Sequence, residues 1–598
     1  MALLLRGSVA VGMLLALGTE LLSAVGGLTP VGVAAWWGLW GAAAAAAAYL
    51  GVRSRVRPAA PAGAPTRTDP AGAALWLGLA VLMLGVLAVA LTAAPATNDS
   101  IDYHLPRVEH WADAGSVAHF PTACRRQVFM NPGAEFALLH LRLLTGGDRL
   151  ANLVQFAAMA VGVAAVARLA RRLGAGPTGR RTAAVAAATL PMGLLQASGT
   201  QNDWCAALWL AVFAVMVVED AGGAWCGAAL GLAVLAKGTA YVYGLPLLAW
   251  YVADRFARRG QGAWATLLIA AVAAAAPNLG HWSRNAALCG SPLGVTHEGR
   301  DDDPHFRLAN AEFGAGPLAS NVLRNLALHA AVPWVTSWNH GVERAVLWLH
   351  RRMDRDVLDP AVTYGGWFEV EWRPDEDAVG NPAHLLLIAA AAVALLRRPP
   401  RRRAALALAG CVAAGFVLFC VLVTWQPWAS RLHLPLFVLA APLIGLWAER
   451  LPRSVAGAPA AVLLAAGLWL AADNDSRPLL GPRSVLTVPR AEQLFRDADR
   501  RYAFEAIAAT VPPGAGELGL VGFTADEYFI RAALRGAGRS PRLRHVLVDN
   551  VTRHAGPPDR PLPEWLLVRV DPGEAPADGT DGHRIVRMVG ALELMHRR

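Results

Sequence analysis

The sequence predicts an all-α polytopic membrane protein of about thirteen transmembrane helices, with outer-side loops and a small C-terminal soluble α/β domain. Three observations predict this fold class. Of the 598 residues, 55% are hydrophobic and 16% are charged, whereas soluble domains carry about 25% charge. Apolar runs of the length that crosses a bilayer, about 20 residues, recur from Ser8 to Ala472. Arginine clusters occupy every second loop between these runs. This composition excludes a soluble multidomain enzyme and a disordered chain.

The apolar runs define the order of the predicted spans and the domain boundaries. The first two spans and a Pro/Ala/Thr-rich linker form an N-terminal region, 1–71, and the remaining spans form a membrane domain, 72–472. The approximate spans are 8–27, 29–51, 72–94, 149–168, 182–199, 203–219, 222–237, 239–254, 262–280, 381–396, 404–424, 432–448 and 455–472.

The arginine clusters predict the orientation of the chain in a plasma (inner) membrane. Short loops rich in arginine mark the cytoplasmic side, so the N-terminus is expected in the cytoplasm. Two loops, 95–148 and 281–380, and the tail, 473–598, are then extracytoplasmic. The net charge of +10 therefore reflects insertion among membrane lipids, and we expect no nucleic-acid partner.

The tail has the pattern of a soluble α/β domain. A helix is predicted over 490–510, followed by a turn at Pro512-Pro513-Gly514 and by strands at 518–523, 545–548 and 565–570. It carries no catalytic motif. The tail therefore either packs on the membrane domain or binds an acceptor.

The six cysteines are scattered and form no CxxC pair, which argues against a structural zinc site. Cys124 and Cys289 both fall on the outer side of the predicted topology. A disulfide between these two is one alternative, and two free thiols are the other.

The first outer loop is unusually rich in polar side chains at the membrane boundary. Asp99, Asp102, Tyr103, His104 and Arg107 follow directly after a predicted span. Apolar residues at helical spacing over 105–112 predict a helix lying along the membrane surface. The segment is either a solvated interfacial loop or a site in which a carboxylate serves as general base.

Three further charged residues fall on the same predicted side. Asp203 stands in a very short loop and either caps a helix or faces a cavity. Lys237 is the only lysine in the chain; it either snorkels to the interface or binds phosphate. Arg431 follows two tryptophans and either anchors a helix at the interface or faces an anionic group. Carboxylates together with cations fit a lipid-phosphate donor whose leaving group needs charge neutralisation.

These residues resemble the GT-C superfamily of polyprenyl-phosphate-dependent glycosyltransferases, which includes protein O-mannosyltransferases and aminoarabinose transferases. The strongest part is Asp99-Ser100-x-x-Tyr103-His104-Leu105-Pro106-Arg107, and the resemblance covers about 72–450. It extends to Trp111, Gly115-Ser116, Arg284-Asn285 and Gly290-Ser291-Pro292-Leu293-Gly294, a pattern similar to a little-characterised bacterial multi-pass branch. Many relatives have Asp-Glu where this chain has Asp99-Ser100.

The resemblance implies a GT-C-like fold and an inverting transfer of a sugar from a polyprenyl-phosphate donor to a glycan, lipid or protein acceptor of the cell envelope. Asp99 and Asp203 take the places of the catalytic acids. The donor phosphate is expected at the cations Lys237, Arg431 and Arg107. Asp102, Tyr103 and His104 are candidate contacts to substrate or to a metal, because some relatives bind a divalent metal near this site.

Two other functions remain open from the sequence. A transporter or flippase for a lipid-linked glycan would place the same charges along a pathway, although transporter sites commonly lie near the midplane. A catalytically silent membrane protein that binds a lipid-linked glycan would use them without turnover. Substrate movement without covalent transfer identifies the former, and binding without turnover the latter.

Overall fold

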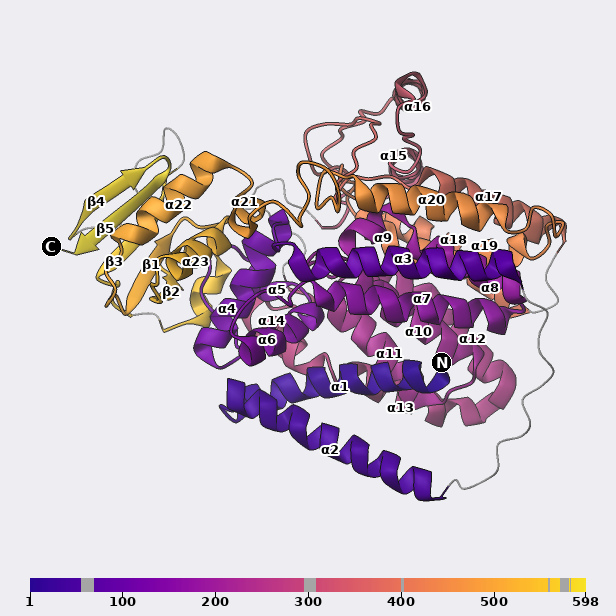
Figure 1. Cartoon of the computed structure of the whole chain (residues 1–598), viewed down its shortest axis with the longest axis horizontal. Coiled ribbons are helices and arrows are strands. Elements are labelled where there is room, and N and C mark those ends of the chain that lie inside the picture. Colours follow the sequence, from indigo (N-terminus) through magenta and orange to yellow (C-terminus); the bar gives the residue numbers. More distant parts are fainter. Residues whose placement is uncertain are drawn as a thin grey trace.

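In the computed structural model the chain forms a bundle of long helices with a smaller α/β domain at one end (Figure 1). The structure describes residues 1–54, 69–294, 308–398, 403–557, 560–570, 580 and 582–597. The predicted linker after the second span therefore lies almost wholly outside the described residues.

Every predicted span coincides with a helix or with a pair of short helices. The span predicted at 182–199 is divided in two, because Pro191 disfavours a helical conformation at the preceding residue, whose ψ is 115°, and starts a new helix. The bundle helices are α1 (Ala2–Ala24), α2 (Pro30–Ser54), α3 (Pro70–Thr92), α7 (Leu153–Leu173), α8 (Pro177–Ala188), α9 (Pro191–Gln196), α10 (Asp203–Val218), α11 (Gly223–Ala236), α12 (Thr239–Arg259), α13 (Ala263–Ala275), α14 (Leu279–Cys289), α17 (Pro382–Arg397), α18 (Arg403–Leu422), α19 (Leu434–Ala448) and α20 (Ala458–Ala472).

The number of full-length spans is smaller than the sequence predicts. Within the described residues, six helices are long and apolar enough to cross a membrane, or up to seven if one bent pair counts as a span. Four further apolar helices, α10, α11, α17 and α20, have only 10–17 residues. The structure thus confirms the prediction of a helical multi-pass membrane protein, with at least six or seven spans. It does not confirm the predicted count of thirteen.

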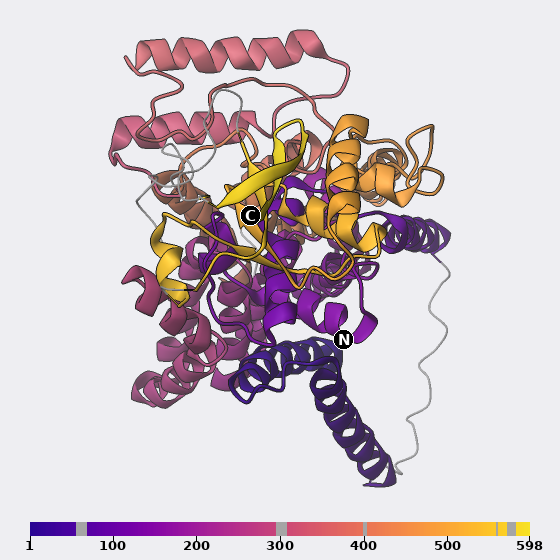
Figure 2. The same ribbon diagram turned by 90° about the vertical axis from the view of Figure 1, so that its left-hand side faces the viewer.

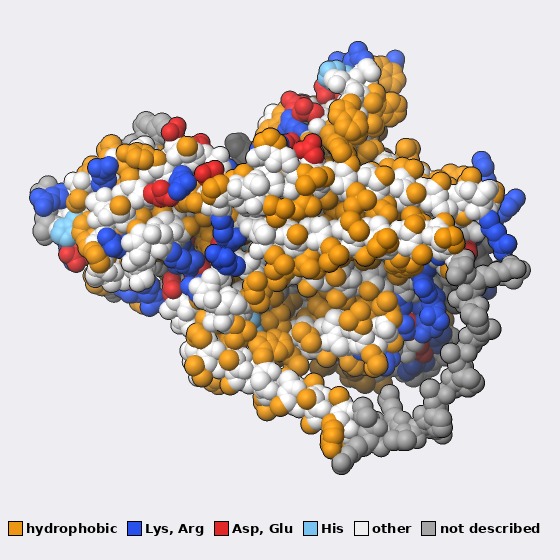
Figure 3. All heavy atoms as spheres, viewed as in Figure 1, with side chains coloured by type: hydrophobic (Ala, Val, Ile, Leu, Met, Phe, Trp, Pro, Cys, Tyr) orange, Lys and Arg blue, Asp and Glu red, His pale blue; other side chains and the backbone are white. Residues whose placement is uncertain are grey.

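The surface of the bundle suits a lipid environment. Leu77 and Leu84 on α3 and Leu268 on α13 are each more than 60% exposed, and orange apolar side chains cover most of the bundle in Figure 3. Basic residues end α7, α12 and α17. In Figure 3 blue side chains gather at the end of the bundle opposite the α/β domain.

The first outer loop is a compact helical layer. It contains a π-helical turn η1 (Ser100–His104) and the helices α4 (Leu105–Ala114), α5 (Arg126–Phe129) and α6 (Gly133–Thr145). The helix predicted along the membrane surface exists as α4 and ends at Gly115, whose φ of +62° suits a left-handed cap. It does not lie on a surface, because all residues from Leu105 to Trp111 are buried.

In its described part after residue 308, the second outer loop carries two helices. They are α15 (Ala315–Ala327) and α16 (Thr336–Arg352), which project from the bundle at the top of Figures 1 and 2. Trp334 and Trp338, near the start of α16, are exposed. Asp377 lies further along this loop, before α17.

The tail forms the α/β domain that the sequence predicts, with more strands than expected. Its elements are α21 (Arg490–Phe495), α22 (Ala498–Thr510), β1 (Glu517–Val521), α23 (Glu527–Gly536), β2 (Arg542–His545), β3 (Trp565–Arg569), β4 (His583–Val589) and β5 (Leu592–Arg597). The sheet order is β2-β1-β3-β5-β4, with β1 parallel to β2 and β3 and with β5 antiparallel to its neighbours.

The helix predicted over 490–510 is broken in the structure. Arg496 adopts a left-handed conformation with φ of +59°, and the Asp497 carboxylate then accepts hydrogen bonds from the amides of Asp499 and Arg500. This side-chain cap starts a new helix.

The α/β domain packs against the first outer loop. Figure 2 shows the sheet in front of the ends of the bundle helices. Tyr528 donates to Asp148 at 3.0 Å, and the Asn550 amide donates to the Thr122 carbonyl at 2.9 Å. Of the two alternatives for the tail, packing on the rest of the chain is therefore observed.

None of the six cysteines forms a disulfide in the structure. The disulfide between Cys124 and Cys289 is thus not formed. Cys124 is buried in the first outer loop.

Candidate active site

An ion pair between Asp99 and Arg431 forms the centre of the site. Asp99 precedes η1, and Arg431 opens a 3₁₀ turn before α19. Arg431 Nη2 donates to Asp99 Oδ2 at 2.6 Å. Its other terminal nitrogen, Nη1, donates to Gln201 and lies 3.4 Å from Asp377 Oδ1. One guanidinium therefore joins the first outer loop, the loop before α10 and the second outer loop.

Arg126 is a second cation at this site. Its two terminal nitrogens lie 3.4 Å from carboxylate oxygens of Asp99 and Asp102. Its guanidinium carbon also stands 5.1 Å from the centre of the Tyr103 ring, within the range of a cation–π contact. Arg126 thus holds together the three first-loop residues Asp99, Asp102 and Tyr103.

The two first-loop carboxylates have opposite acid–base behaviour. Burial raises the pKa of Asp99, but the charges of Arg431 and Arg126 outweigh it and hold this pKa below its usual range. Burial raises the pKa of Asp102 to about 6, because its more distant cation, Arg126, compensates only in part. Asp99 is therefore firmly ionised, whereas Asp102 changes protonation near neutral pH.

Asp203 and Lys237 form a second ion pair. The Lys237 ammonium lies 2.7 Å from Asp203 Oδ1, and Lys237 occupies an extended break between α11 and α12. Asp203 is the first residue of α10 and is fully buried. Its second oxygen, Oδ2, has no hydrogen-bond partner among the described residues. The capping alternative is not seen, because neither Asn202 nor Asp203 caps α10 with its side chain.

The two ion pairs belong to one cluster. The charge of Asp203 acts on Arg431 together with those of Asp99 and Asp377. Of the residues predicted from the sequence, the structure thus brings together Asp99, Asp102, Tyr103, Asp203, Lys237 and Arg431. We call these six residues, with Arg126, Gln201 and Asp377, the charged cluster.

His104 and Arg107 lie behind the charged cluster. His104 Nδ1 and Arg107 Nη1 contact the same Glu135 oxygen at 2.9 and 3.2 Å. Arg107 also donates to the carbonyls of Arg126 and Gln127, and its side chain is completely buried. These contacts engage all three guanidinium nitrogens of Arg107, the residue that the sequence assigns to a donor phosphate. The structure therefore does not bring Arg107 into the charged cluster.

The predicted metal contacts do not converge on one point. Within the described residues, the only three His, Cys, Asp or Glu side chains with ligand atoms close enough to share a metal are His110, Glu527 and His545. His104, by contrast, faces Glu135. A divalent metal at Asp102 and His104 is therefore not supported by their positions.

Four residues near the site are not predicted from the sequence: Arg126, Glu135, Gln201 and Asp377. Gln201 is only two residues from Asp203, and this proximity is the single signal that could have found it. The other three stand in long loops with many polar residues. Only the folded structure shows that Arg126, Glu135 and Asp377 contact the site residues that the sequence predicts.

Known proteins provide a family match and a fold match. Residues 134–281, which include Asp203 and Lys237, match the model of the family "Dolichyl-phosphate-mannose-protein mannosyltransferase". Two crystal structures of ArnT from Cupriavidus metallidurans, one bound to undecaprenyl phosphate and one in the apo state, superpose with a TM-score of 0.56. Each has 14% sequence identity to this chain, with 88% of this chain and 98% of that chain covered. No curated protein sequence matches the chain.

At this identity the ArnT structures establish the fold. The family match reports independently on the segment that runs from α6 to the start of α14. Both findings confirm the resemblance that the first-loop motif indicates. The chain thus has an ArnT-like fold, and its segment 134–281 is similar to the dolichyl-phosphate-mannose-protein mannosyltransferase family.

Proposed function

We propose that this protein transfers a sugar from a polyprenyl-phosphate donor to a glycan, lipid or protein acceptor of the cell envelope, with inversion at the sugar carbon. The donor class is supported by the ArnT relative, one crystal structure of which is bound to undecaprenyl phosphate. The observation that carries the proposal is the charged cluster, in which two cations each pair with a carboxylate that the sequence singles out.

The donor phosphate binds between Lys237 and Arg431. A lysine ammonium and an arginine guanidinium are the groups that proteins use for phosphate. Both are paired with aspartates, so an incoming phosphate competes with Asp203 and Asp99. Because Arg431 is a main cause of the low pKa of Asp99, its turn toward the phosphate makes Asp99 a stronger base. Donor binding therefore activates the base.

The chemical step is a single displacement. A hydroxyl oxygen of the acceptor attacks the anomeric carbon as its proton passes to Asp99, and the bond from that carbon to the phosphate oxygen breaks. The leaving polyprenyl phosphate keeps the electron pair and is stabilised by Lys237 and Arg431. Asp102 holds Arg126 beside Asp99. Tyr103, which packs against Arg126, forms one wall of the site.

Asp102 is the second candidate for the base. Its pKa of about 6 is better matched to proton transfer near neutral pH than the low pKa of Asp99 in the free enzyme. The variant Asp102→Asn separates the two candidates, because it should abolish transfer if Asp102 is the base and remove only the acid limb if Asp99 is the base.

The proposed location is the outer face of the plasma membrane. The basic ends of α7, α12 and α17 lie opposite the α/β domain (Figure 3), and such ends are cytoplasmic in most membrane proteins. This orientation supports a cytoplasmic N-terminus, a membrane catalytic domain over 72–472 and an extracytoplasmic domain over 473–598. The charged cluster then faces the cell envelope.

The test is transfer by purified protein in lipid nanodiscs. With a radiolabelled polyprenyl-phosphate sugar and a cell-envelope extract as acceptor, we expect a labelled product that resists mild acid. Asp99→Asn should lower kcat by about 100-fold or more, because a general base contributes at least that much. Asp475→Asn, which removes an exposed carboxylate paired with Arg483, is the matched control and should retain activity.

The outcome that contradicts the proposal is equally specific. Reconstituted vesicles that move the labelled donor between leaflets without a new glycosidic bond identify a transporter. Donor binding with no product in any extract identifies a silent binding protein.

A further inference from the structure

We propose that the C-terminal α/β domain is a positioning unit for the catalytic loop, and that it acts on Asp102 through the Asp526 amide and through the side chains of Glu527 and Gln127. The importance of Asp102 rests on the proposed function, whereas the contacts themselves do not. The tail carries no catalytic motif in the sequence, so this assignment gives it a role in the reaction.

The first link is a hydrogen bond from the domain to the Asp102 carboxylate. The backbone amide of Asp526 donates to Asp102 Oδ1 at 3.0 Å. Asp526 adopts a left-handed conformation with φ of +63° directly before α23, and its carboxylate is held by Arg569 at 2.8 Å. A residue of β3 thus fixes the turn that presents this amide to Asp102.

The second link is Gln127, whose side chain is fully buried. Gln127 Nε2 donates to the Asp102 carbonyl and to Glu527 Oε2, both at 2.9 Å. Gln127 Oε1 accepts from the Thr122 hydroxyl at 2.8 Å. Both amide hydrogens are therefore used, one on the catalytic loop and one on the α/β domain, so the two parts are clamped by one side chain.

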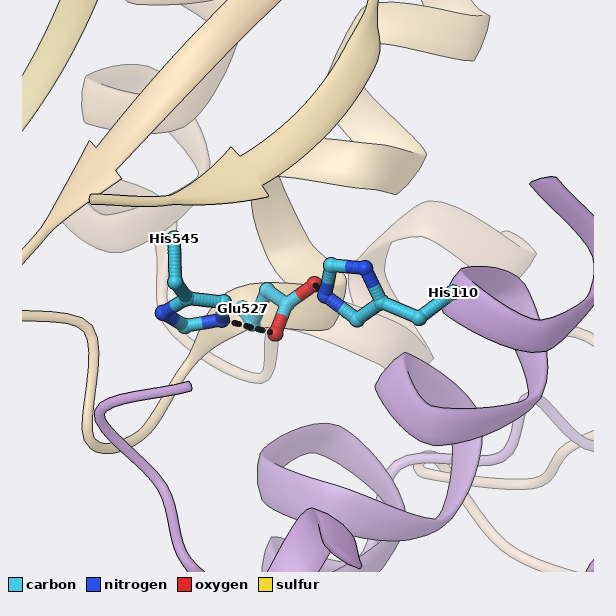
Figure 4. Close-up of side chains that lie close together, drawn as sticks. All are labelled: His110, Glu527 and His545. Carbon is cyan, nitrogen blue, oxygen red and sulfur yellow. Dashed lines mark hydrogen bonds and ion pairs between the residues drawn. The ribbon is translucent and has the colours of Figure 1, made fainter. Parts of the chain in front are cut away.

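Glu527 is the fixed end of this clamp. His110 Nε2, His545 Nε2 and Arg531 Nε lie at 2.9, 3.0 and 3.1 Å from its oxygens. Figure 4 shows the carboxylate of Glu527 between the two imidazole rings, with His110 projecting from α4 and His545 from the end of β2. Burial raises the pKa of Glu527, but the two histidines outweigh it and hold this pKa well below its usual range. The Glu527 carboxylate therefore stays negatively charged.

The side chains of His110, Glu527 and His545 are also of the types that bind a metal ion. The hydrogen bonds of His545 distinguish a metal site from a contact that holds the domain in place. His545 Nδ1 accepts from the Ala123 amide at 3.3 Å, so the ring proton lies on Nε2, the nitrogen that faces Glu527. A metal on Nε2 would place a proton on Nδ1 against the Ala123 amide. In metal sites this second nitrogen faces an acceptor instead. Arg531 adds a positive charge beside the carboxylate. We therefore assign the cluster to a latch of ion pairs and hydrogen bonds between α4 and the α/β domain.

The latch is tested first without any catalytic assay. Hydrogen–deuterium exchange of the nanodisc-embedded protein should show faster exchange over residues 97–105 in Glu527→Gln and in Gln127→Leu, which removes both clamp donors at similar size. Glu564→Gln, which loses an exposed carboxylate paired with His596 in the same domain, is the matched control. Unchanged exchange over 97–105 in both clamp variants, with the domain folded, overturns the proposal.

The second readout is kinetic. If the domain positions Asp102, Gln127→Leu should lower kcat by about tenfold to 100-fold, the cost of a small misplacement of catalytic groups, with little change in donor KM. Asp526→Gly keeps the amide and the left-handed turn but removes a negative charge that raises the pKa of Asp102, so its acid limb should move to lower pH. A donor KM that rises as much as kcat falls, or an acid limb that stays in place, contradicts positioning of Asp102.

The two proposals fail in distinguishable ways. If no sugar is transferred by the wild-type protein, the proposed function fails while the exchange experiment still decides the latch. Metal analysis of protein purified with added zinc completes the test. Zinc retained at one equivalent by the wild type and lost in His545→Gln overturns the latch in favour of a metal site, and no retained zinc supports it.

Discussion

Asp99 and Asp102 lie three residues apart and share Arg126, yet only Asp99 also contacts Arg431. This difference in cations separates their pKa values, one below its usual range and one at about 6. Groups whose environments push their pKa values apart are typical of acid–base sites. The roles of the two carboxylates therefore follow from which arginine each one faces.

The pH dependence of transfer tests this division. Asp102 loses its charge as the pH falls through about 6, after which Arg126 turns to Asp99 alone and weakens it as a base. We expect kcat/KM to fall below about pH 6, and this limb to disappear in Asp102→Asn. A limb that remains near pH 6 in Asp102→Asn contradicts the assignment, and wild-type activity that stays flat to pH 5 assigns the base to Asp99 alone.

Lys237 and Asp203 give a second prediction at this scale. Lys237→Met removes a phosphate ligand and leaves the buried Asp203 without its partner. We expect donor KM to rise by about tenfold or more, because charge-assisted hydrogen bonds contribute about 1.5–3 kcal/mol. Arg483→Met, which removes an exposed arginine, is the control. Equal donor KM values for the two variants would remove Lys237 from the donor site.

At the residue scale the sequence predicted most of the charged cluster. Asp99, Asp203, Lys237 and Arg431 stand out as charges beside apolar runs, where an ionisable group is costly without a purpose. Loop residues such as Arg126 have no such contrast with their neighbours. Their contribution depends on how the loop folds.

Among the elements, α4 shows where a periodic pattern is ambiguous. Its apolar spacing predicts a helix with one buried face, but it cannot show what covers the other face. In the structure α6 and α23 pack against it, and the tail supplies α23 from more than 400 residues later in the chain. The polar side of α4 is thus buried by ion pairs instead of lipid head groups.

Arg107 supplies the test at this scale. Arg107→Met leaves Glu135 buried with only His104, and breaking a buried ion pair costs about 3–5 kcal/mol. We expect a lower unfolding temperature and an unchanged donor KM in the protein that remains folded. A raised donor KM at unchanged stability would return Arg107 to the phosphate site that the sequence assigns to it.

At the scale of the whole molecule, the arginine clusters and the lengths of the apolar runs differ in how well they predict the structure. Apolar runs predicted every helix of the bundle except α14, yet α10, α11, α17 and α20 are too short to meet the length of a full span. A run of apolar residues does not show where a helix begins and ends inside a bundle. The arginine clusters, by contrast, agree with the basic end seen in Figure 3.

The proposed orientation is tested by labelling introduced cysteines in intact cells. Glu505→Cys on α22 and Arg453→Cys between α19 and α20 are both on the surface, at opposite ends of the molecule by the proposed topology. A membrane-impermeant maleimide should label the former in intact cells and the latter only after lysis. The reverse pattern contradicts an extracytoplasmic α/β domain.

The proposed function requires that Arg431 and Lys237 bind the phosphate of a lipid-linked sugar that is then transferred. Its most direct measurement is single-turnover transfer from a radiolabelled polyprenyl-phosphate sugar in nanodiscs, comparing wild-type protein with Arg431→Met and with the exposed control Arg483→Met. We expect transfer by the wild type and the control and at least a 100-fold slower step in Arg431→Met, because the developing charge on the phosphate loses a donor. Equal rates in all three proteins would contradict it.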